Sequence, residues 1–161
     1  MERISRQQMF MQMAEVAALR STCSRGNVGC LVVMDNDILS MGYNGPPAGD
    51  DHCKGNLCER SSNGGCLRSI HAEVNALDRA MAKELPVSNG GWDLYCTMQP
   101  CFHCAVEIVG SPVTRMFYRH PYRLPDGLEA LGRGGVKVYR VTPSGLIIEG
   151  ATGLILDPKD L

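Results

Sequence analysis

Two short stretches of the chain combine side chains that bind metal with one that can move a proton. They are His71-Ala72-Glu73 and Pro100-Cys101-Phe102-His103-Cys104. Cys101 and Cys104 stand three residues apart behind a proline that suits the first helical position, so both thiols face one point. The start of a helix also favours the thiolate, which is the form that binds zinc. Two thiolates and one imidazole would leave a fourth position open for water, as in a catalytic zinc site.

Glu73 has a different expected task from His71. Residues i and i+2 of a regular helix point about 200° apart, so we expect His71 to precede the first helical residue. Glu73 then need not bind the metal, and can take a proton from a zinc-activated water and deliver it to a substrate. A Pro-Cys-x-x-Cys turn alone also fits a redox motif or a structural zinc turn, but the upstream His-Ala-Glu favours catalysis. We interpret His103, on another face of its helix, as a surface or interface histidine.

The elements that must position these residues follow from the apolar pattern. A first helix is expected over 7–20, with Met9, Met13 and Val16 spaced to pack in the core. A hairpin and then alternating helices and strands predict an α/β fold, namely a three-layer α/β/α sandwich with a mixed five-stranded sheet. The tail is interpreted as a small ribbon or an oligomer contact. The expected later elements are strands 28–34, 38–43, 92–97, 113–118 and 136–141, and helices 70–84, 101–109 and 124–131.

The length indicates a single domain over residues 1–161, and the motifs described above make it a zinc-dependent one. The formal net charge of −1 and the pI of about 6.4 disfavour binding to a nucleic acid backbone. No apolar run approaches the roughly 18 residues of a membrane span, so no membrane is expected as a partner. The first residues lack the apolar segment of a secretion signal, and we therefore expect a cytoplasmic protein.

A cysteine-rich insert over about 45–69 has too few apolar residues to order itself by burial. Cysteines in a reducing compartment bind metal, act in catalysis or lie in the core. We predict a second, structural zinc, with two alternatives left open: His52 replaces one cysteine, or no metal binds. Cys30 and Cys96 fall in predicted strands and are expected to be small buried hydrophobes. The four candidate zinc ligands are Cys23, Cys53, Cys58 and Cys66.

Taken together, these motifs resemble those of deoxycytidylate deaminases within the cytidine deaminase superfamily, over most of residues 8–140. The resemblance implies zinc-dependent hydrolysis of dCMP to dUMP and ammonia, which supplies dUMP for thymidylate synthesis. It also implies a homohexamer that is activated by dCTP and inhibited by dTTP, with Mg²⁺ accompanying the triphosphate. The matching motifs are Thr22-Cys23-Ser24-Arg25 before Val28-Gly29, Gly42-Tyr43-Asn44-Gly45, His71-Ala72-Glu73-Val74-Asn75-Ala76 and Pro100-Cys101-x-x-Cys104.

The same resemblance assigns substrate contacts by position. Asn44 would bond the sugar, Arg25 would meet the phosphate, and Tyr122 would reach the phosphate from the opposite loop. Arg119 and Arg123 are alternative phosphate ligands. Each position also has a plain structural interpretation, because Asn-Gly is a common turn pair and the loop around Tyr122 is basic and aromatic in any case.

Regulatory triphosphate is expected near the turn over 42–49, at a subunit contact. Asn44 and Gly45 would contribute there, and Lys54 and Arg60 could add positive charge.

Three rival functions remain open at this point. A free-cytidine deaminase usually has cysteine in place of His71 and lacks the cysteine insert. A tRNA or DNA base deaminase is disfavoured by the near-neutral charge. A catalytically silent zinc module, used for scaffolding or nucleotide sensing, has no need for the carboxylate of Glu73.

Overall fold

The computed structural model describes residues 3–53, 59–60, 62 and 66–161. Its sheet has the strand order β2-β1-β3-β4-β5-β6-β7, with β3, β4 and β5 parallel and the remaining pairs antiparallel. The mixed sheet of the predicted fold is confirmed, but the count of five strands was wrong. The tail adds β6 and β7 to the edge of the main sheet. The strands are β1 (Gly29–Met34), β2 (Asp37–Tyr43), β3 (Trp92–Met98), β4 (Val113–His120), β5 (Lys137–Val141), β6 (Ile147–Glu149) and β7 (Ile155–Leu156).

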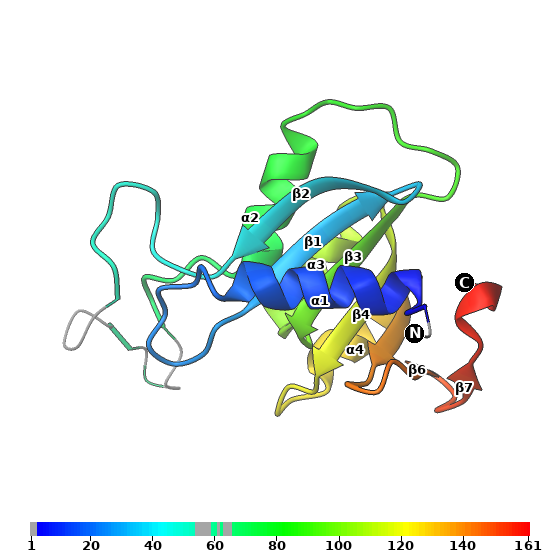
Figure 1. Cartoon of the computed structure of the whole chain (residues 1–161). Helices are drawn as coiled ribbons and strands as arrows, with labels where there is room; N and C mark the ends of the chain where they lie inside the picture. The colour runs from blue at the N-terminus through cyan, green and yellow to red at the C-terminus, as the bar shows by residue number, and fades with distance from the viewer. Residues whose placement is uncertain (1–2, 54–58, 61, 63–65) are drawn as a thin grey trace.

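Helices cover both faces of this sheet. Helix α1 (Arg6–Ala18) crosses one face, and α2 (Ala72–Met81), α3 (Phe102–Val109) and α4 (Asp126–Arg133) lie on the other (Figure 1). A short 3₁₀ helix, Pro158–Asp160, follows β7. Side chains along β1 alternate between the two faces of the sheet, so Leu31 packs on the α1 side and Val32 packs on the α2 side.

The two cysteines predicted to be core residues are buried. Cys30 in β1 lies directly opposite Cys96 in β3, and both side chains are fully inaccessible. Burial raises the pKa of each thiol, so both stay protonated and apolar in character at neutral pH. They occupy the sheet face on which α2 and α3 pack.

Two glycines let helices come unusually close to the β1–β2 hairpin. A Cβ atom on Gly29 would lie 2.0 Å from the Ala14 carbonyl oxygen in α1, and one on Gly42 would lie 2.3 Å from the Ala72 carbonyl oxygen in α2. No side chain fits at either position. The start of α2, which carries the metal-binding motif, is therefore fixed against β2 by backbone contact.

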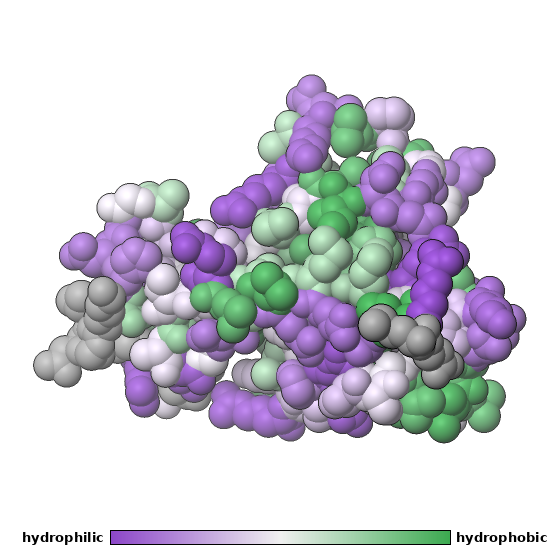
Figure 2. All heavy atoms as spheres, in the orientation of Figure 1, coloured by the Kyte–Doolittle hydropathy of each residue, from purple (hydrophilic) through white to green (hydrophobic). Residues whose placement is uncertain are grey.

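The predicted core stripe of α1 was wrong. Met9, Met13 and Val16 are all exposed, and the residues that face the sheet are Phe10, Met11, Ala14, Ala17 and Ala18. The close approach at Gly29 accounts for the alanines, since only small residues such as Ala14 and Ala18 fit where the helix backbone nearly touches the strand. Apolar side chains consequently gather on the outer surface over α1 (Figure 2).

No helix within the described ranges combines the length and the apolar character that crossing a membrane requires.

Candidate active site

The first residues of α2 and α3 bring the two metal-binding motifs together. His71 is the residue before α2 and has extended backbone angles of φ −73° and ψ 153°. Cys101 occupies the same place before α3, with φ −73° and ψ 170°. His71 therefore precedes the helix, as the i, i+2 argument required, while Glu73 lies in the first turn of α2.

The donor atoms of His71, Cys101 and Cys104 lie within 4.8 Å of one another. His71 Nδ1 is 3.2 Å from Cys104 Sγ and 3.7 Å from Cys101 Sγ. Tetrahedral zinc, with Zn–N near 2.05 Å and Zn–S near 2.3 Å, places such nitrogen and sulfur atoms about 3.6 Å apart. The three side chains thus fit the donor set and the spacing of a zinc ion that keeps one open position.

Electrostatics favour a thiolate in this group. The Cys104 thiol donates to Cys101 and holds the pKa of Cys101 down, to about 3, with the hydrogen bond to His71 adding to the effect. The same interaction raises the pKa of Cys104. The pKa of His71 is raised, mainly by its hydrogen bond to Cys101. Negative charge is thus already stabilised where a zinc cation would bind.

Glu73 is 4% exposed, beside the metal-binding group but outside it. Burial is the main cause that raises its pKa above the usual value for a carboxyl group. A carboxyl group that gives up and regains its proton nearer to neutral pH is suited to general acid-base work.

A cavity of about 110 Å³ opens on this group. It brings Glu73 together with two residues predicted to bind substrate, Asn44 and Tyr122. It is also lined by Gln99, which sequence reasoning missed. The one available signal was its position directly before Pro100. The other lining residues are Val28, His71, Ala72, Met98 and Cys101.

Asn44 at the end of β2 is buried and secures the segment that follows Arg25. Its Oδ1 accepts a hydrogen bond from the Val28 amide at 2.8 Å, and its Nδ2 donates to the Gly26 carbonyl at 2.9 Å. One N–H of the amide and one lone pair of its oxygen remain for a ligand. Arg25 itself is exposed and does not line the small cavity.

The two alternative phosphate ligands behave differently. Arg119 is 3% exposed and forms an ion pair with Glu15 of α1 at 2.7 Å, and it donates to the Val141 carbonyl at 2.9 Å. It joins α1 to the end of β5, so its interpretation as a phosphate ligand was wrong. The Arg123 guanidinium carbon lies 5.7 Å from the centre of the Tyr122 ring and accompanies that residue.

A second cavity, of about 580 Å³, lies on the other side of the Asn44 segment. Gly45 lines it together with His52, Asn75 and the basic Arg20 and Arg79. Arg60 does not line it, and the Asn44 side chain belongs to the smaller cavity instead.

The remaining predicted metal ligands are only partly described. Cys23 and Cys53 are buried and Cys66 is half-buried. These three cysteines are not gathered as a metal-binding group within the described part of the chain. Cys58 and Lys54 lie outside the described residues, so the second zinc site and the Lys54 contact stay predictions. His103 is exposed on α3, with the Phe102 ring at its edge.

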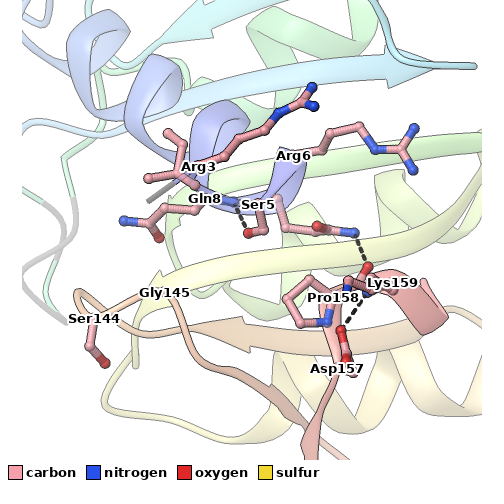
Figure 3. A pocket seen from close by; sticks show the side chains of 11 residues that line it. Arg3, Ser5, Arg6, Gln8, Ser144, Gly145, Asp157, Pro158 and Lys159 are labelled. Atoms are coloured by element: carbon pink, nitrogen blue, oxygen red, sulfur yellow. Dashed lines mark hydrogen bonds between the residues drawn. The ribbon is translucent and has the colours of Figure 1, made fainter. Parts of the chain in front are cut away.

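A larger cavity, of about 840 Å³, lies far along the molecule from the metal-binding group. Its walls come from the start of α1 and from the segments around 144–145 and 157–159 (Figure 3). Arg3, Arg6 and Lys159 give it a basic character beside one carboxylate, Asp157, and among the described residues no metal-binding group lies there. The smaller cavity is therefore the candidate active site.

Comparison with known proteins gives a consistent result. Residues 4–120 match the family model of the cytidine and deoxycytidylate deaminase zinc-binding region. The chain is 35% identical to ComE operon protein 2 of Bacillus subtilis over 92% of its own length and 78% of that protein. It is 34% identical to the deoxycytidylate deaminase of Saccharomyces cerevisiae, over 80% of the chain but only 42% of the yeast protein. Its fold is similar to the crystal structure of dCMP deaminase from cyanophage S-TIM5 in complex with dCMP and dUMP, with a TM-score of 0.70 and 37% identity. The match covers 83% of this chain and 95% of the cyanophage chain.

Proposed function

Because the chain belongs to the cytidine and deoxycytidylate deaminase family, we propose that it is a dCMP deaminase that releases dUMP and ammonia. The observation that carries the proposal is one cavity in which the zinc-binding group, the buried Glu73 and the two predicted substrate residues meet. The similar cyanophage enzyme was solved with dCMP and dUMP, the substrate and product of this reaction.

The reaction adds water to C4 of the cytosine ring and breaks the bond from C4 to the amino nitrogen. Zinc held by His71, Cys101 and Cys104 would polarise the attacking water and lower its pKa. Glu73 takes one proton from that water and delivers it to ring N3, and then passes the remaining hydroxyl proton to the amino nitrogen, which leaves as ammonia while C4 becomes a carbonyl. Its burial supports this role, because a carboxylate with few water contacts accepts a proton more readily.

Nucleotide specificity is assigned to the residues around the cavity mouth. Asn44 bonds the sugar with the N–H and the lone pair left free by its backbone contacts. Arg25 and Tyr122 meet the phosphate from opposite sides, with Arg123 beside the Tyr122 ring. A phosphate with two basic neighbours gains charge-assisted hydrogen bonds that a free nucleoside lacks.

The decisive experiment follows the absorbance change of deamination with purified, zinc-loaded protein. Substrates are dCMP, deoxycytidine, CMP and a single-stranded oligonucleotide. We expect dCMP to give the highest kcat/KM, with deoxycytidine at least about tenfold lower, since one charge-assisted contact contributes about 1.5–3 kcal/mol. Equal values for dCMP and deoxycytidine would rule out phosphate recognition, and turnover of the oligonucleotide alone would indicate a nucleic acid deaminase.

Regulation is proposed for the 580 Å³ cavity beside Gly45. Arg20 and Arg79 supply the positive charge there that a triphosphate with Mg²⁺ requires. We expect dCTP to activate and dTTP to inhibit a homohexamer. Light scattering of the purified protein tests the oligomer, and the deamination assay with each triphosphate tests the sign of regulation.

A second, structural zinc is proposed for Cys23, Cys53, Cys58 and Cys66. Cys23 and Cys53 are buried, but among the described residues they are not gathered with Cys66 as a metal-binding group, so the proposal requires these thiols to draw together around the ion. Metal analysis is expected to give about two zinc ions per chain, falling to about one in Cys53→Ser. A value near one in the unsubstituted protein would remove the second site.

A further inference from the structure

Gln99 holds the end of the parallel β3–β4 pair together at the point where the backbone can no longer do so. Its own amide donates to the His120 carbonyl at 2.8 Å, which continues the hydrogen bonding of the two strands. The next residue, Pro100, has no N–H to donate, and α3 begins soon afterwards. The backbone pairing therefore stops just before the segment 121–124.

The side chain of Gln99 supplies two further bonds to this segment. Its Oε1 accepts from the Tyr122 amide at 3.2 Å, and its Nε2 donates to the Leu124 carbonyl at 2.9 Å. Together with the backbone bond to His120, these bonds attach every second residue from 120 to 124 of the adjacent segment to one glutamine. A side-chain amide has the acceptor and the donor of a peptide group, so it can extend the pairing past the proline.

Burial makes these bonds consequential. Gln99 is 4% exposed, so a lost partner would leave a buried polar group unpaired rather than hydrated. The far end of the segment is fixed separately, because a Cβ atom on Gly127 would lie 2.1 Å from the Pro100 carbonyl oxygen. Tyr122 lies in the part of the segment that Gln99 holds, and it lines the candidate active site together with Gln99.

We propose that Gln99 is a positioning residue that fixes the segment 121–124, and with it Tyr122, at the wall of the substrate cavity. The inference rests on the proposed function, in which Tyr122 contributes to nucleotide binding. Gln99 acts through the loop and not on the reacting atoms. Its loss should weaken binding of dCMP while the zinc-binding group and Glu73 keep their arrangement.

The test variant is Gln99→Met, which keeps the length of the side chain and removes both hydrogen bonds. We expect the KM for dCMP to rise about tenfold, with kcat within about threefold and the zinc content unchanged, as for loss of a buried hydrogen bond pair that serves binding. In a Tyr122→Ala background the same substitution should change KM by less than about twofold, because coupled residues are non-additive. Equal effects of Gln99→Met in both backgrounds would overturn the proposal.

Gln7→Met is the matched control. Gln7 is also a buried glutamine and donates to the backbone carbonyl of Pro158, but it does not line the candidate active site. It should leave the KM for dCMP unchanged. Should the methionine variant fail to fold, Gln99→Glu keeps an acceptor for the Tyr122 amide and removes the donor to the Leu124 carbonyl. It is expected to raise KM in the same direction by a smaller factor.

A second readout does not depend on activity. Hydrogen exchange of the zinc-loaded protein without nucleotide should show the Tyr122 amide exchanging at least about tenfold faster in Gln99→Met, with α3 unchanged. If the unsubstituted protein fails to deaminate dCMP, the proposed function falls while the exchange result still decides whether Gln99 holds the loop. Unchanged exchange at Tyr122 overturns the inference, and so does faster exchange in an active enzyme whose KM stays the same.

Discussion

Replacing Glu73 by glutamine separates proton transfer from metal binding and from stability. Glutamine has nearly the same shape but cannot carry the proton. General acid-base catalysis contributes about 10²–10⁴ in rate, or about 3–5.5 kcal/mol at 1.36 kcal/mol per tenfold change. We expect kcat for dCMP to fall by that factor. Zinc content should stay the same, since Glu73 lies outside the group formed by His71, Cys101 and Cys104.

Although Glu73→Gln should lower kcat, it should raise the stability of the metal-free protein at neutral pH. Burial raises the pKa of Glu73 in the folded state, so its contribution to the free energy of unfolding is full below the unfolded value of about 4.3. That contribution is lost as the pH rises through the raised folded pKa. Glutamine does not titrate, so Glu73→Gln should match the unsubstituted protein near pH 4 and become progressively more stable in comparison toward pH 8.

The assay combines deamination rates, metal analysis and thermal unfolding of metal-free protein between pH 4 and 8. Glu107→Gln, an exposed carboxylate on α3, is the control and should leave all three unchanged. Simultaneous loss of zinc would show that Glu73 is a ligand. A kcat within tenfold of the unsubstituted value would refute its role in proton transfer, and a stability difference that does not vary with pH would refute the burial argument.

Three other predictions follow from the packing and the charges. Gly42→Ala should destabilise the fold by about 1–3 kcal/mol and weaken zinc binding, because the added Cβ meets the backbone of α2. Gly26→Ala is the control, since an added Cβ there has nothing within 4 Å, and it should change neither urea unfolding nor zinc titration. In zinc-free protein, iodoacetamide should modify Cys101 at a rate nearly constant from pH 5 to 9, because a pKa near 3 keeps this side chain a thiolate. The buried Cys96, whose pKa is raised, should stay unmodified. Mass spectrometry measures the modification of both cysteines, and added zinc should protect Cys101. Asn44→Ala should cost about 1–3 kcal/mol in urea unfolding, since the Val28 amide loses its acceptor; an unchanged midpoint would contradict this.

Sequence reasoning found the residues whose chemistry depends on local spacing. His71, Cys101 and Cys104 could be paired because each motif stands at a predicted helix start, and helix starts at one edge of a sheet converge. The buried positions of Cys30 and Cys96 followed from their place within strands. Such features need only the local period and the type of side chain.

What the sequence could not supply depends on contacts between distant segments. Arg119 was interpreted from the sequence as an alternative phosphate ligand, but Glu15, 104 positions away, forms an ion pair with it inside the protein. The buried face of α1 was mispredicted because apolar spacing ignores size, whereas contact with Gly29 requires small residues at Ala14 and Ala18. Gln99 had no motif at all, because its partners belong to a loop more than twenty residues later.

The positions of His71 and Cys101 also bear on how the first turns of two helices stay wound. Each is the N-cap of its helix, and neither side chain makes the usual capping hydrogen bond to the amides of the first turn. A missing cap typically costs a helix about 0.5–2 kcal/mol. A zinc ion bound to both side chains would anchor the two uncapped ends to one point and offset that cost. Removal of zinc should therefore fray α2 and α3 together from their first turns, which links the folding of two helices that are far apart in the chain.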